Sequence, residues 1–140
     1  MLKIKWIDWI KLGAIAGAIW SIIAAILVNV FGSNLGGILI DAGPLTLSNV
    51  ITGVFYGVVY ALLGRVITEF IGFQSKESIW KIFQVLFTGE LAVLLIAMLT
   101  RDIAITSIVT RVFGALIACF VQSWIIVELY KRVGWRLPVQ

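Results

Sequence analysis

Long stretches of apolar residues without any charge are the feature that most restricts the fold. Residues 12–40 and 42–64 contain no Lys, Arg, Asp or Glu, and each is longer than the about 20 residues that a helix needs to cross a bilayer. In the second half of the chain, single charges at Glu90 and Arg111 interrupt two further stretches of this length. The sequence therefore predicts an all-α membrane protein, a bundle of four transmembrane helices. We expect these helices at residues 10–31, 45–64, 79–99 and 104–130.

The overall composition supports the same class and excludes much catalytic chemistry. Charged residues make up 13% of the 140 residues and hydrophobic ones 61%, with a mean hydropathy of +1.10, whereas soluble domains carry about 25% charged residues. The chain has no histidine and one cysteine, which excludes histidine-based catalytic triads, the usual zinc sites and an internal disulfide. We therefore expect a protein that is not an enzyme and that holds no metal and no cofactor.

The chain is expected to form one integral membrane domain over residues 1–140, because no proline-rich or serine-rich linker divides it. A secretory signal is the competing interpretation of the N-terminus. The apolar stretch there, however, is longer than the about 7–15 residues of a signal peptide core, and three more spans follow. Residues 51–55 (ITGVF) and 109–113 (VTRVF) align at an offset of 58 residues. This alignment leaves open a fold of two similar helical hairpins, with chance similarity as the alternative.

The basic residues lie at the ends of the apolar stretches and indicate the orientation of the chain. Short loops that carry Lys and Arg stay on the cytoplasmic side of a membrane. Nine of the eleven basic residues are expected on one side: Lys3, Lys5, Lys11, Arg65, Lys76, Lys81, Lys131, Arg132 and Arg136. This pattern predicts a multi-pass protein of the cell membrane with both termini in the cytoplasm. Four tryptophans beside these clusters are expected to anchor the helices at the interface: Trp6, Trp9, Trp80 and Trp135.

Small residues at four-residue spacing predict which helices pack together. Membrane helices associate where small side chains let their backbones approach closely. The first helix carries Gly13, Gly17 and Ser21, and the second carries Gly53 and Gly57, so we expect these two helices to pack on each other. The alternative is that one of these two rows of small residues, which we call ladders, faces another subunit of a homo-oligomer. Gly114 and Ala118 are two further small residues. We expect them to let another helix pack closely against the fourth helix.

Glu90 and Arg111 are the candidate functional residues, because charges inside a membrane span are rare and suggest function by default. Both are expected at similar depth on adjacent antiparallel helices, where they can form an ion pair. Ser107 and Gln122 share a face with Arg111 and can form hydrogen bonds there. Three roles remain open for the pair: a structural ion pair, conduction or transport, and contact with another subunit, a lipid headgroup or a cofactor.

The sequence thus favours a non-enzymatic accessory subunit or assembly scaffold, part of a homo-oligomer or a larger membrane complex. The alternative is a homo-oligomeric channel or transporter for a small ion or solute that uses Glu90 and Arg111. The formal net charge of +4 could also indicate nucleic-acid binding, but basic residues spread over helix ends form no single basic face. We therefore expect the lipid bilayer as the partner and no nucleic acid.

Overall fold

The computed structural model describes residues 6–31, 46–72, 78–100 and 105–137, and this part of the chain is helical apart from short ends. Four helices follow one another, and each is long and apolar enough to cross a membrane. They are α1 (Trp6–Phe31), α2 (Leu47–Ile71), α3 (Ser78–Thr100) and α4 (Ile105–Val133). This is the architecture of an integral multi-pass membrane protein. The remaining residues, including Lys3, Lys5 and Lys76, lie outside the described part.

Helix α2 differs most from its expected bounds, because it continues to Ile71 instead of ending at Gly64. Arg65 and Glu69 allow this extension because they lie four residues apart and form a salt bridge along the helix. The helix ends at Gly72, which adopts a left-handed conformation with φ of 76°. At its start, the side chain of Thr46 accepts a hydrogen bond of 3.2 Å from the backbone N–H of Asn49 and caps the first turn.

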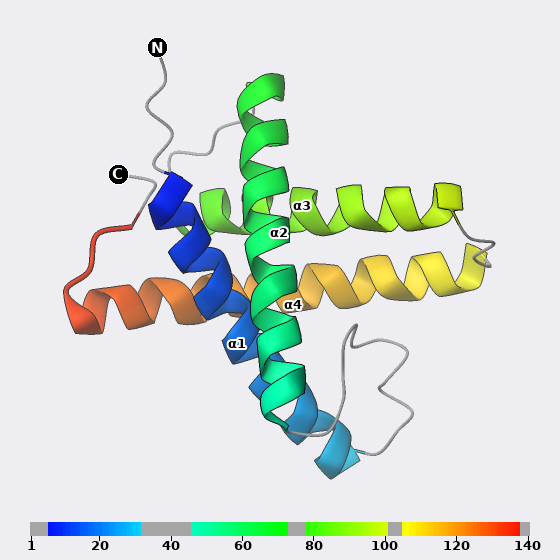
Figure 1. Ribbon diagram of the computed structural model, residues 1–140, viewed down its shortest axis with the longest axis horizontal. Helices are drawn as coiled ribbons and strands as arrows, with labels where there is room; N and C mark the ends of the chain where they lie inside the picture. Colours follow the sequence, from blue (N-terminus) through cyan, green and yellow to red (C-terminus); the bar gives the residue numbers. More distant parts are fainter. Residues whose placement is uncertain (1–5, 32–45, 73–77, 101–104, 138–140) are drawn as a thin grey trace.

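The four helices form two pairs that cross each other at a wide angle (Figure 1). Helices α1 and α2 form one pair, and α3 and α4 run side by side across it. The start of α1, the end of α2, the start of α3 and the end of α4 lie toward the same side of the molecule. We call this side the basic end, since Lys11, Arg65, Lys81 and Lys131 belong to these helix termini.

The tightly packed core lies in the basic half of the molecule. Its buried members come from all four helices and from the short segment after α4: Trp9, Leu12, Ala16, Ala61, Ile82, Val85, Leu86, Cys119, Ile126, Val127, Tyr130 and Leu137. At the opposite end, large side chains such as Phe31, Leu47 and Leu99 are exposed. Apolar exposure of this kind suits a lipid environment. The packed core therefore lies toward the basic end, although large apolar side chains such as Ile7 and Phe70 are exposed at that end as well.

Glycines bring the helix backbones together at the two crossings that involve α2. A methyl group on Gly17 would overlap the carbonyl of Gly53, and one on Gly57 would overlap the carbonyl of Gly13. The ladder residues of α1 and α2 thus lie against each other. Helices α2 and α3 meet in the same way, because Gly64 lies against the Val85 carbonyl and Gly89 against the Tyr60 carbonyl. The sequence analysis did not single out these last two glycines.

The end of α4 is joined to the start of α1 at the basic end. Gly134, with φ of 78°, turns the chain, and its amide and that of Trp135 both donate to the Tyr130 carbonyl. The Trp135 ring then lies 3.6 Å from the Lys11 ammonium, a cation–π contact. Leu137 follows and is buried in the core. The segment after α4 therefore folds back and covers the core, instead of extending away from the molecule.

Candidate functional site

The candidate site is a small cavity around Glu90, halfway along the bundle. Its volume is about 20 Å³, which is room for about one water molecule. All four helices line it: Gly17, Trp20 and Ser21 of α1, Gly53, Tyr56, Gly57 and Tyr60 of α2, Glu90 of α3, and Gly114, Ala115, Ala118 and Gln122 of α4. A carboxyl group therefore stands where the four helices meet.

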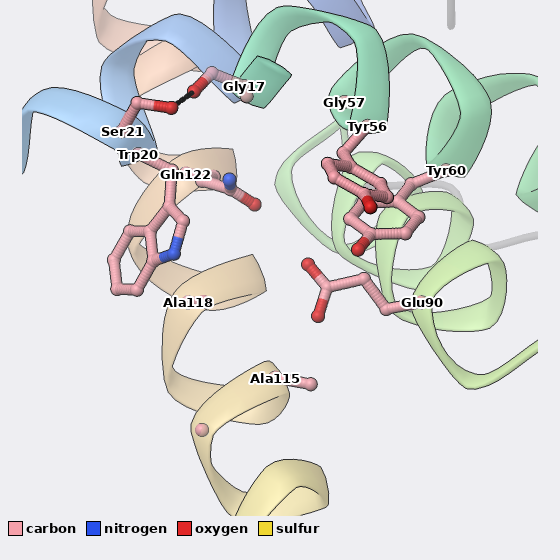
Figure 2. A pocket seen from close by; sticks show the side chains of 12 residues that line it. Gly17, Trp20, Ser21, Tyr56, Gly57, Tyr60, Glu90, Ala115, Ala118 and Gln122 are labelled. Atoms are coloured by element: carbon pink, nitrogen blue, oxygen red, sulfur yellow. Dashed lines mark hydrogen bonds between the residues drawn. The ribbon is translucent and has the colours of Figure 1, made fainter. Parts of the chain in front are cut away.

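Two tyrosines of α2 face the Glu90 side chain. Tyr56 and Tyr60 lie one helical turn apart, and their rings stack with centroids 6.0 Å apart. Figure 2 shows both hydroxyl groups pointing toward the Glu90 carboxylate across the cavity. Hydroxyl groups both donate and accept hydrogen bonds, so this face of the cavity can serve Glu90 in either protonation state.

Gln122 and Ser21 supply the remaining polar groups of the cavity. The Gln122 amide nitrogen donates a hydrogen bond of 3.2 Å to the Ala16 carbonyl, which ties α4 to α1. Figure 2 shows the amide oxygen on the cavity side. The Ser21 hydroxyl donates at 2.9 Å to the Gly17 carbonyl of its own helix, so it satisfies itself locally. Both groups therefore offer an acceptor oxygen to the cavity, because a hydroxyl that donates a hydrogen bond can still accept one.

Cys119 also belongs to the surroundings of Glu90. Its side chain is fully buried in the core, and its thiol interacts with the Glu90 carboxylate. The sequence pattern does not place Cys119 at the site, because an isolated cysteine in an apolar span is not by itself a sign of a functional site. The thiol marks the boundary between the polar cavity and the packed core of the basic half.

Two further hollows continue from the cavity toward the start of α4. One, of about 70 Å³, is lined by Glu90, Arg111 and Tyr60 among mostly apolar residues, and it shares Tyr60, Glu90 and Ala115 with the first cavity. The other, of about 310 Å³, is lined by Arg111 together with three hydroxyl residues: Thr106, Ser107 and Thr110. Arg111 belongs to both hollows. The three spaces therefore form a series in the sense that neighbours share lining residues, and the outermost is lined by α4 alone.

The structure brings most of the expected site residues together. Glu90, Gln122, Gly17, Ser21, Gly53, Gly57, Gly114 and Ala118 line the first cavity. Gly13 lies one turn away, against Gly57 and Ala61. Arg111 and Ser107 lie outside this cavity but share the outermost hollow. Glu90 and Arg111 face one common hollow, and their ion pair stays a prediction.

A second charged pair within a helix was missed by the sequence analysis, which placed Arg65 in a loop. Arg65 and Glu69 form a salt bridge along α2, and each side chain is only 12% exposed. The Arg65 guanidinium also lies 5.7 Å from the centre of the Trp9 ring. The available signal was the four-residue spacing of opposite charges, which is typical of a continuing helix.

The four tryptophans expected at the interface differ in their surroundings. Trp6, Trp80 and Trp135 are between 43% and 44% exposed, which leaves them able to contact lipid headgroups. Trp9 is only 1% exposed and lies in the core. The expectation of an anchor at Trp9 is therefore corrected: position 9 faces the other helices, where its ring packs near Arg65.

Comparison with known proteins adds no relative to this description. No protein-family model matches the chain, and neither a curated protein nor a solved structure is significantly similar to it. The functional argument therefore depends on the site itself.

Proposed function

We propose that this chain is a non-enzymatic protein of the cell membrane that moves a small ion across the bilayer, with Glu90 as the ion-binding group. The observation that carries the proposal is the position of Glu90 in a cavity lined by all four helices. An ionisable side chain within a membrane span is costly, and such residues mark ion and substrate pathways. The lining by all four helices supports a binding group that needs no second chain.

The series of hollows supports this proposal further. It leads from the hydroxyl-lined hollow at Thr106, Ser107 and Thr110 past Arg111 to Glu90. Beyond Glu90, the packed core lies toward the basic end, and the two hollows there, of about 440 Å³ and 380 Å³, share no lining residue with the Glu90 cavity. Access from one side at a time is the property that a transporter needs, and a hollow that stops at a binding group is consistent with it.

Ion flux into liposomes tests the proposal. Purified protein is reconstituted, and flux is compared for wild type, Glu90→Gln and Glu90→Asp. We expect flux in the wild type, its loss in Glu90→Gln because the carboxylate is gone, and partial flux in Glu90→Asp. Glu128→Gln is the matched control, since Glu128 is a partly exposed residue paired with Lys131 at 3.7 Å and lines a separate hollow at the basic end that shares no residue with the Glu90 cavity. A wild type that moves no ion tested would contradict the proposal.

We also propose that both termini face the cytoplasm and that the hollows open to the outside. The described residues of the predicted cytoplasmic set belong to one side of the molecule, the basic end. Positive charge concentrated at one membrane face favours that face as cytoplasmic.

The second candidate function is an accessory subunit or scaffold within a homo-oligomer or larger complex. Thr106 and Ser107 are exposed on α4 and line a hollow with Arg111, and polar groups on a membrane helix favour a neighbouring chain. The small-residue ladders of α1 and α2 no longer support this candidate, since they pack against each other. Native mass spectrometry from mild detergent tests it: a strict monomer without partners would contradict it.

A further inference from the structure

We propose that the ion is the proton and that Glu90 carries it. This inference rests on the proposed function and names its substrate. The cycle needs two proton transfers on opposite sides: the Glu90 carboxylate takes a proton from water in the adjoining hollow and becomes a carboxylic acid, and it then gives that proton to water that reaches it from the other side when the helices open there. The O–H bond of the acid breaks as the O–H bond of the hydrated proton forms, and no other reactant is required.

The size of the cavity favours a proton over a hydrated metal ion. A volume of about 20 Å³ holds about one water molecule, whereas a metal ion must either keep its hydration shell or exchange it for a ring of protein oxygens. A proton needs only a titratable group and a hydrogen-bonded neighbour. The Tyr56 and Tyr60 hydroxyls, which point toward Glu90 in Figure 2, are such neighbours.

The lining of the route also favours a proton. Between Arg111 and Glu90 the hollow of about 70 Å³ is lined by apolar side chains such as Leu91, Val93 and Leu94. These side chains offer no oxygen ligand to a bare metal ion. Water in this hollow can pass a proton along hydrogen bonds without a metal ion having to enter.

The charged and titratable groups that face Glu90 agree with this role. Helix α2 contributes Tyr56 and Tyr60, and helix α4 contributes Arg111 and Cys119. Helix α1 contributes no titratable group to the lining of these cavities in the described part of the chain. Arg111 is thus the permanent charge on the hollow that Glu90 faces, and it stabilises the carboxylate once the proton has left.

Carbodiimide labelling of the reconstituted wild-type protein tests the inference directly. A dicyclohexylcarbodiimide molecule reacts with a carboxyl group only in its protonated form: the acid adds its oxygen to the carbon and its proton to the nitrogen of one C=N bond. We expect mass spectrometry to find the adduct on Glu90 and its yield to rise as the pH falls. Glu128, which is partly exposed, is the internal control and should remain unlabelled because water competes there.

A second measurement identifies the ion. A pH-sensitive dye inside the liposomes should report proton flux in the wild type and in Glu128→Gln, and loss of that flux in Glu90→Gln. Sodium or potassium flux without proton flux would overturn this inference and leave ion movement standing, and so would a Glu90 that is unlabelled at every pH. Labelling of Glu90 without flux of any ion would instead overturn the proposed function, since it would show a protonated carboxyl group that moves nothing.

Discussion

Glu90 and Arg111 stand at the two ends of one hollow, and their charges bear on both folding and ion movement. An unpaired charge within a membrane span is costly, and in the predicted ion pair each of the two groups would lower the cost of the other. The proton inference adds a second relation, because the carboxylate forms when the proton leaves and Arg111 is then its stabilising neighbour.

Coupling between the two residues can be measured as stability. We expect Glu90→Gln and Arg111→Met each to lower the free energy of unfolding by about 1–3 kcal/mol, because each strands the opposite charge. The double variant should lose less than the sum, since no charge remains stranded. Unfolding in mixed detergent gives the free energy of unfolding of the wild type, of the two single variants and of the double variant. Losses that simply add would show that the two side chains do not interact.

The glycines of the α1–α2 crossing are the second set of residues that the structure makes critical. We expect Gly57→Ala to lower the free energy of unfolding by about 1–3 kcal/mol, because the added methyl group overlaps the Gly13 carbonyl. Val66→Ala, at an exposed position of the same helix, is the control and should change stability little. Thermal unfolding in detergent gives both values, and equal stability of the two variants would contradict the described crossing.

These residues also show what sequence reasoning can reach. Gly17 and Gly57 were identifiable because their spacing repeats on one helix face, and Glu90 because a charge is rare in a span. Gly64 and Gly89 have no such repeat, so only the crossing of α2 and α3 reveals their role. Cys119 and Trp20 lie near the site because of how the helices pack. A linear pattern of apolar residues does not determine that packing.

At the scale of single helices, α2 departs most from its predicted bounds. The charge-free stretch of the sequence ends at Gly64, because Arg65 follows it. The predicted helix therefore ends at Gly64. The Arg65–Glu69 salt bridge and the contact of Arg65 with Trp9 let the helix carry both charges further. The expected bounds of α3 and α4 lie closer to the described ones, because single charges there were bridged.

This salt bridge is expected to stabilise the end of α2. Arg65→Met should lower the free energy of unfolding by about 1–3 kcal/mol, since Glu69 is then a largely buried charge without its partner. Adding Glu69→Gln should restore part of the loss. Chemical unfolding of the single and double variants measures this difference. Lys131→Met, which removes the more exposed pair with Glu128, should have a smaller effect.

At the scale of the whole molecule, the number and class of the helices followed from the sequence, whereas their crossing did not. Hydropathy determines that a segment lies in the membrane, but lipid-facing and helix-facing apolar residues look alike in the sequence. The concentration of the buried core toward the basic end therefore emerges only from the structure. The two-hairpin repeat and the orientation stay predictions.

Orientation can be tested with cysteines at opposite ends of the molecule. Arg136→Cys lies at the basic end and Thr106→Cys at the start of α4, and both positions are exposed. We expect an impermeant maleimide to label Thr106→Cys in intact cells and Arg136→Cys only in inverted vesicles. The parent protein is its own control, because Cys119 is fully buried. The reverse labelling pattern would show the opposite orientation.

The crossed helix pairs have a consequence for the surrounding lipid. Helices of 23 to 29 residues are about 35 to 44 Å long, whereas a bilayer core is about 30 Å thick. Two pairs that cross at a wide angle cannot both stand along the membrane normal, so tilt absorbs the excess length. A thinner bilayer favours a wider opening of the pairs and a thicker one a narrower opening, with the glycine contacts as the pivot. We expect membrane thickness thereby to change the distance between the helix ends near the start of α4, where Arg111 and three hydroxyl residues line a hollow.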